Sequence, residues 1–141
     1  MLSRDEAVEV IDRLHDAQAR LYGDGDPGPV RDVLTEDIAW HVPGTSPIAG
    51  SYHGVDEVVG YMLARRELAH GTFVMHRLDV LTGVGDTVAV LTDGEVSVGG
   101  AVRRWSTVGV YRLRDGRVAE CRLVPFDQAE FDDIWTVRKP E

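Results

Sequence analysis

The sequence predicts an α+β fold, with N-terminal helices packed on one face of a strongly curved antiparallel β-sheet that leaves a hollow between the two layers. Two patterns support this. In the first third of the chain, apolar residues recur at steps of three and four, as on one face of a helix. From Thr72 onward they alternate with polar residues between Gly-containing turns, as in strands. We expect residues 1–141 to form a single domain.

The first predicted helix begins at a capping box, because Ser3 and Glu6 have the required spacing. The Gly- and Asp-rich segment 23–28 ends this helix, and Pro29 suits the first position of a short second helix. The long helix then has one apolar face, formed by Ala7, Val8, Ile11, Leu14, Ala17 and Leu21.

A third helix is predicted after Gly54. Asp56 and Glu57 lie in its first turn, and Arg65 and Arg66 come late, so its charges complement the helix dipole at both ends. Its apolar stripe consists of Val55, Val58, Val59, Met62 and Leu63.

The strongest hairpin signal is the turn at residues 114–117, which contains Asp115 and Gly116. It joins a strand through Trp105 to one through Cys121. Apolar residues at the end of the chain then predict a short terminal helix or coil: Phe126, Phe131, Ile134 and Trp135.

Composition limits the partners. With 24 acidic and 15 basic residues the net charge is -9, which repels phosphate backbones and anionic lipid headgroups, so we expect neither nucleic acid nor membrane as a partner. The single cysteine, Cys121, excludes an internal disulfide, and we expect a reducing, cytoplasmic compartment. No histidine pair has the spacing of a metal site, so we expect no metal and no cofactor.

Several segments carry a resemblance to a known family. They are WHVPG at 40–44, the segment 49–54 that opens a helix, the hairpin at 110–118, and Asp127-Gln128 leading to Trp135. Together they resemble the cone-shaped fold of nuclear transport factor-like proteins, ketosteroid isomerases, limonene epoxide hydrolases and SnoaL-like polyketide cyclases. The resemblance implies a cone with an internal pocket, a small apolar molecule as ligand, and a homodimer paired through the sheet.

The chain departs from this family at two catalytic positions. Ketosteroid isomerases have a proton-abstracting Asp directly before a proline of the first strand, where this chain has Val42 before Pro43. SnoaL-like cyclases and limonene epoxide hydrolases have an acid on the last strand, where alignment through residues 126–127 places Val124. The resemblance therefore predicts the pocket more directly than the reaction.

His41 and Asp127 are the candidate catalytic residues. Strand alternation turns His41 away from the pocket side of Trp40 and Val42, but a kink at residues 43–44 would swing the imidazole over the pocket mouth. The alternative is a His41 bonded to the loop at 45–51. Asp127 would act as a base or orient a histidine, and the favoured alternative is an N-cap of the terminal helix.

Aromatic, apolar and basic residues make up the candidate ligand-binding set. Tyr61 or Trp105 would donate to the oxygen of an enolate, and an inward-facing Arg104 or Arg122 would bind a carboxylate or enolate. The predicted set is Trp40, Val42, Tyr61, Met62, His76, Trp105, Arg122, Val124 and Phe126.

These residues support two main hypotheses of function. The first is an isomerase-like or cyclase-like enzyme that moves protons on an apolar carbonyl compound. The alternative is a non-catalytic protein that binds small ligands, or a dimerising accessory domain, because Val42 and Val124 replace the expected acids. The enzyme hypothesis predicts an imidazole or carboxylate inside the cavity, within hydrogen-bond distance of a second polar group.

Overall fold

The computed structural model describes residues 2–23 and 25–136. Its helices are α1 (Arg4–Tyr22), α2 (Gly28–Val33), α3 (Val55–Leu68) and α4 (Gln128–Trp135). Its strands are β1 (Leu34–Val42), β2 (Gly50–His53), β3 (Val74–Thr82), β4 (Thr87–Val98), β5 (Ala101–Arg114) and β6 (Arg117–Pro125). The predicted α+β class is confirmed.

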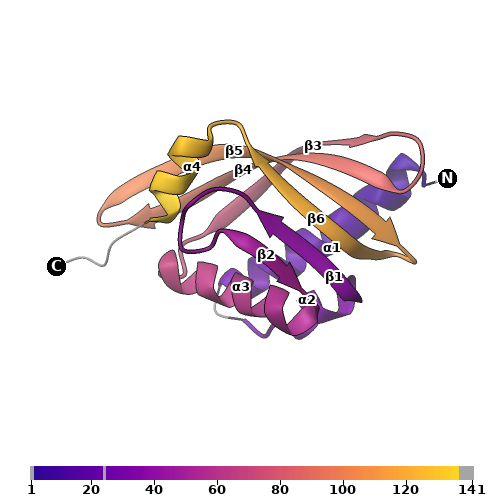
Figure 1. Ribbon diagram of the computed structural model, residues 1–141, viewed down its shortest axis with the longest axis horizontal. Helices are drawn as coiled ribbons and strands as arrows, with labels where there is room; N and C mark the ends of the chain where they lie inside the picture. The colour runs from indigo at the N-terminus through magenta and orange to yellow at the C-terminus, as the bar shows by residue number, and fades with distance from the viewer. Residues whose placement is uncertain (1, 24, 137–141) are drawn as a thin grey trace.

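One sheet of six strands runs in the order β2-β1-β6-β5-β4-β3 (Figure 1). Strands β3 to β6 form an antiparallel meander, and the predicted hairpin joins β5 to β6 through Asp115 and Gly116, both at positive φ. Strand β1, however, pairs parallel with β6, so the sheet is mixed rather than wholly antiparallel. A long stretch of chain separates these two strands, and no tight turn imposes an antiparallel direction.

The helices pack on one side of this sheet, with α1 along β3 and α3 against β1 and β2 (Figure 1). The capping box is confirmed, because the backbone N–H of Glu6 donates to Ser3 Oγ at 3.1 Å. Asp12 of α1 and Arg77 of β3 form an ion pair at 2.7 Å. The apolar face of α1 is buried against the sheet. The polar residues of α1 that flank this face therefore lie at the boundary between the helices and the sheet.

Helix α4 closes one end of the space between the layers. Its buried residues are Phe131, Ile134 and Trp135. The ring of Trp135 lies 5.2 Å from that of Phe73 and 5.4 Å from that of Trp105, so the terminal helix is anchored by aromatic contacts. Of the short terminal helix or coil expected from the sequence, the structure has the helix.

Candidate functional site

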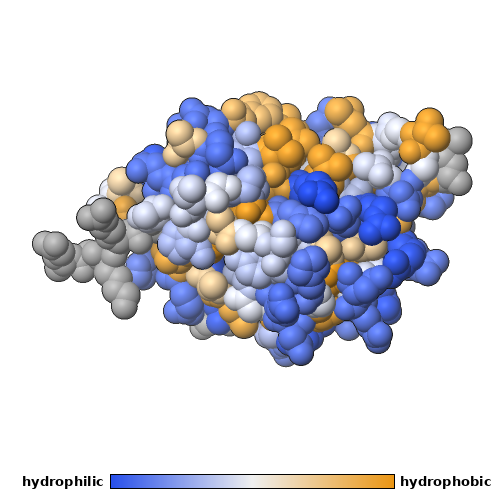
Figure 2. Space-filling view, in the orientation of Figure 1, coloured by the Kyte–Doolittle hydropathy of each residue, from blue (hydrophilic) through white to orange (hydrophobic). Residues whose placement is uncertain are grey.

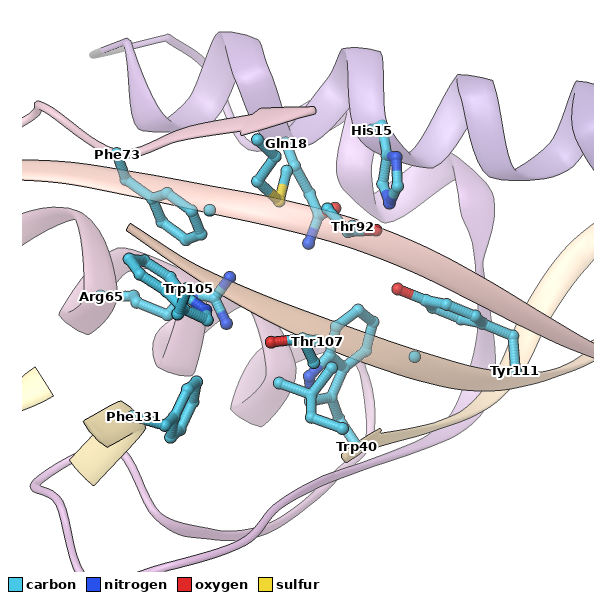
Figure 3. A pocket seen from close by; sticks show the side chains of 14 residues that line it. His15, Gln18, Trp40, Arg65, Phe73, Thr92, Trp105, Thr107, Tyr111 and Phe131 are labelled. Carbon is cyan, nitrogen blue, oxygen red and sulfur yellow. The ribbon is translucent and has the colours of Figure 1, made fainter. Parts of the chain in front are cut away.

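A cavity lies between the sheet and helices α1, α3 and α4 (Figure 3). Its volume is about 40 Å³, more than the roughly 10–15 Å³ that one water needs and less than the roughly 150 Å³ of a cavity that takes benzene. Its walls are His15, Gln18, Trp40, Arg65, Phe73, Met75, Thr92, Gly94, Trp105, Thr107, Gly109, Tyr111, Leu123 and Phe131.

Two glycines of the sheet make room for aromatic rings in the cavity wall. Gly94 of β4 lies directly opposite Trp105 of β5, and a Cβ at position 94 would collide with the indole ring. A Cβ on Gly109 would lie 2.6 Å from Cε2 of Tyr111. The two rings therefore lie flat on the strands, which keeps the space above them open.

Arg65 is the most unusual residue of the cavity. It follows Tyr61 by one helical turn on the buried face of α3, and it is only 5% exposed. Its guanidinium donates to the Tyr61 hydroxyl and lies 4.5 Å from the ring centre of Phe73 and 5.3 Å from that of Trp135. Figure 3 shows this guanidinium reaching into the cavity beside Trp105 and Thr107.

No carboxylate of the described residues forms an ion pair with Arg65. Burial raises the pKa of the neighbouring phenols Tyr22, Tyr61 and Tyr111, so these groups are neutral at pH 7. Burial acts to lower the pKa of Arg65, but the surrounding tyrosines, Tyr22 and Tyr61 foremost, together act more strongly in the opposite direction, and the pKa is raised. The site thus holds a buried positive charge without a balancing negative one.

Five polar atoms of the cavity side chains are buried and lack a hydrogen-bond partner among the described residues. They are His15 Nδ1, Gln18 Oε1, Trp40 Nε1, Arg65 Nε and Thr107 Oγ1. Most buried polar groups in proteins are hydrogen-bonded, so these five groups offer hydrogen-bonding positions around one cavity to a ligand or to water.

His15 reaches from α1 toward the cavity (Figure 3). Burial lowers its pKa to about 4, an effect that Arg77 strengthens and that Asp12 and Asp16 oppose. The imidazole is therefore neutral at pH 7 and carries one nitrogen able to accept a proton. The enzyme hypothesis predicts an imidazole or carboxylate in the cavity that is hydrogen-bonded to a second polar group. His15 meets the first condition but not the second, because no described side chain bonds to its Nδ1.

The predicted ligand-binding residues divide into three groups. Trp40 and Trp105 line the cavity. Val42, Tyr61 and Met62 are buried but do not line it, and the Tyr61 hydroxyl accepts a hydrogen bond from Arg65 rather than facing a ligand.

The other four predicted residues lie outside the cavity, which corrects the sequence-based placement. Arg122, Val124 and Phe126 are exposed, because β6 turns Cys121 and Leu123 inward instead. The alternation along this strand was therefore assigned in the wrong phase. His76 is also exposed, and an irregularity in the pairing of β3 with β4 interrupts the alternation that placed it on an apolar face.

The two predicted catalytic residues also lie outside the cavity. His41 Nδ1 is 2.8 Å from Ser51 Oγ, and its Nε2 is 3.2 Å from Glu120 Oε2. Arg122 pairs with Glu120 at 3.5 Å, and we call these four residues the outer His41 cluster. Asp127 caps α4, accepting from the backbone N–H of Glu130 at 3.0 Å, so the N-cap interpretation is confirmed.

Arg65, His15 and Gln18 line the cavity but do not belong to the set predicted from the sequence. Arg65 was grouped with Arg66 as a charge at the helix end, although it lies seven residues after buried Val58 and so on the same face. Gln18 follows buried Leu14 by four residues. Helical spacing therefore places both residues on a buried face, although polar side chains are ordinarily expected at the surface.

The described residues contain no group of three His, Cys, Asp or Glu side chains able to hold a metal ion. None of the helices in this part of the chain has the length and apolarity needed to cross a membrane.

The chain is similar in sequence to one domain family and in structure to several solved proteins. The profile of the SnoaL-like domain matches residues 12–121. The uncharacterized protein Rv0034 of Mycobacterium tuberculosis is 29% identical over 119 residues, which cover 84% of this chain and 73% of Rv0034. Bal32a, from a soil-derived mobile gene cassette, is 25% identical with a TM-score of 0.79, covering 92% of this chain and 98% of its own. An NTF2-like protein of Burkholderia pseudomallei is 22% identical with a TM-score of 0.77, and the match covers 96% of this chain and 100% of the Burkholderia chain.

Proposed function

The chain belongs to the SnoaL-like domain family and has the nuclear transport factor-like fold, and on this basis we propose that it is an enzyme that moves protons on a small carbonyl compound. The observation that carries the proposal is the set of five unpartnered polar atoms around one cavity, with the unpaired cation of Arg65 among them. Such a constellation of unused groups suits a ligand oxygen better than it suits a packed core.

Arg65 would bind the carbonyl oxygen of the substrate. Its Nε–H is free to donate, and Trp40 Nε1–H and Thr107 Oγ–H are further unpartnered donors in the same cavity. Negative charge grows on this oxygen as an enolate forms, and a buried cation stabilises that charge more strongly than the neutral carbonyl. This differential stabilisation lowers the barrier to proton removal.

His15 would take the proton. The C–H bond next to the carbonyl breaks, its proton moves to Nδ1 of the neutral imidazole, and its electron pair forms the C=C bond of the enolate. Where a C=C bond of the substrate is conjugated with the enolate, return of the proton to the far carbon of that bond completes an isomerisation, so atoms and charge balance without a cofactor.

The test is exchange of carbon-bound hydrogen in D₂O, followed by proton NMR on a panel of small ketones and 2-oxo acids. The protein should accelerate exchange next to the carbonyl, and Arg65→Met and His15→Gln should each reduce the rate about a hundredfold. His41→Ala and Asp127→Asn are controls outside the cavity and should keep the rate. Compounds that bind without any exchange would contradict the proposal.

A non-catalytic binding function is the second candidate, and two observations favour it. No carboxylate is found among the described side chains that line the cavity, and burial lowers the pKa of His15 to about 4, which makes the imidazole a weak base. This function predicts that ligands raise the melting temperature while the protein leaves their hydrogens unexchanged.

We further propose a homodimer that pairs through the outer face of the sheet. Leu91, Val108 and Val124 are direct neighbours across β4, β5 and β6, and Val124 is 52% exposed. Figure 2 shows hydrophobic atoms gathered on the upper part of the molecule, where Figure 1 draws the sheet. Light scattering should give the mass of a dimer, and Val124→Glu should shift it toward the monomer. A monomer at all concentrations would exclude this pairing.

A further inference from the structure

We propose that the ligand of the cavity is a compact organic mono-anion, a carboxylate or enolate whose negative charge pairs with Arg65. This inference rests on the proposed function only in taking the cavity as the ligand site. The charge of the ligand follows from the surroundings of Arg65, and its size follows from the volume of the cavity.

The charge argument begins with the cost of burial. A cation removed from water is stable only if other groups replace its hydration, and an unpaired buried charge is strongly unfavourable. Around Arg65 the replacement is incomplete, because one hydroxyl accepts a hydrogen bond, the surrounding phenols are neutral, and Nε remains without a partner.

Aromatic rings supply part of the missing stabilisation. The guanidinium carbon lies 4.5 Å from the centre of Phe73, 5.1 Å from Tyr61, 5.3 Å from Trp135 and 5.4 Å from Tyr22. Each ring presents its negative face to the cation and so stabilises it. The rings hold the guanidinium in place but carry no net charge, so an anion bound beside Arg65 would still be the first negative charge it meets.

The donors in the cavity suit a two-oxygen anion. Arg65 Nε–H offers one donor of a guanidinium fork, and the hydroxyl of Thr107 and the indole N–H of Trp40 are two more unpartnered donors. A carboxylate has two oxygens and several lone pairs to accept from them, whereas an amide of the same shape has one such oxygen and brings N–H groups toward a cation.

Size restricts the ligand to a short chain. At about 40 Å³ the cavity is smaller than one that takes a benzene ring, so a three-carbon acid fits it better than an aromatic acid. A ring would require movement of the cavity wall, in which Met75 and Leu123 are half-buried. The site therefore favours propionate-sized anions over benzoate-sized ones.

The experiment compares propionate with propionamide, and benzoate with benzamide, by ¹H–¹⁵N NMR of the side-chain N–H groups of Arg65 and Trp40. We expect propionate to bind about tenfold more tightly than propionamide and to shift both signals. Equal affinity of acid and amide, or no shift of either signal, would overturn the inference. This wild-type comparison needs no variant to fold.

Two variants then locate the charge. Arg65→Met should abolish the preference for the acid, and Arg65→Lys should keep the preference with weaker binding, because a lysine retains the charge but lacks the planar fork. Arg122→Met removes an arginine from the outer face and should leave the preference unchanged. Preference that survives Arg65→Met would place the anion elsewhere and overturn the proposal.

The outcomes separate this inference from the proposed function. An amide that binds in the cavity as well as the acid would end the anion proposal and leave proton transfer on a neutral carbonyl compound intact. Acids that bind through Arg65 without hydrogen exchange would support the anion proposal and contradict the enzyme.

Discussion

The cavity and the outer His41 cluster both contain ionisable side chains, yet they differ in how those side chains are satisfied. In the outer cluster both ring nitrogens of His41 have partners, and Glu120 bonds on two sides. In the cavity, Arg65 Nε and His15 Nδ1 are buried and have no described partner. Hydrogen bonds that are already formed leave little for a ligand to add, so the cavity is the better candidate for a ligand site, although the outer cluster contains the more familiar residues.

The largest expected difference between the cavity and the outside of the molecule concerns two phenylalanines. Phe131 is 1% exposed in the cavity wall, and Phe126 is 69% exposed on the outside. Phe131→Ala should lower the free energy of unfolding by about 3–5 kcal/mol, because it removes a buried ring and leaves a void. Phe126→Ala should change it by less than about 0.5 kcal/mol. Urea unfolding of both variants measures the contrast, and similar losses would show that Phe126 is buried in solution.

A pH effect of similar size is expected from His15. Its pKa is lowered from 6.5 to about 4, so the unfolded state binds more protons between these values and the folded state loses stability as the pH falls through this window. The loss should approach about 3 kcal/mol at 1.36 kcal/mol for each pKa unit. Urea unfolding at pH 7 and at pH 4 should therefore show a smaller acid loss for His15→Gln than for the wild type. Parallel losses would mean that the imidazole is solvated.

A matched pair of glycines tests the packing of the cavity wall. Gly94→Ala places a methyl group against Trp105 and should destabilise the protein by about 1–3 kcal/mol. Gly60→Ala adds the same methyl group on the exposed side of α3, where nothing lies within 4 Å, and should stabilise it by about 0.5–1 kcal/mol. Thermal unfolding gives both signs. A neutral Gly94→Ala would show that the indole moves freely.

The smallest expected effect is on the outer cluster. His41→Ala removes two hydrogen bonds of half-buried and exposed groups and should cost about 1 kcal/mol. Ligand affinity in the cavity should stay within about twofold of the wild type, measured by calorimetry. A large loss of affinity would connect the two regions and restore a functional role for His41.

The sequence predicted the architecture well, because periodicity and turns are local properties. The capping box at Ser3, the hairpin at Asp115 and the N-cap at Asp127 all depend on neighbours a few residues away. The parallel pairing of β1 with β6 depends on distant segments, and no local pattern specifies it.

The site was predicted less completely, for a physical reason. Trp40 and Trp105 were found because aromatic residues are expected inside. Arg65 was missed because burial of an arginine depends on the surrounding rings, which come from α1, α4 and the segment before β3. On β6, a shift of one residue in the alternation determines whether Leu123 or Val124 faces inward.

The parallel pairing of β1 with β6 has a consequence for the order of folding. The β3–β6 meander forms through contacts between neighbouring segments, whereas Trp40 meets its neighbour Cys121 only after most of the chain has been brought together. Contacts that close long loops form late, because their entropic cost is met only when much of the structure exists. The wall of the cavity that holds Trp40 should thus be the last to assemble, and a ligand present during refolding would act on this final step.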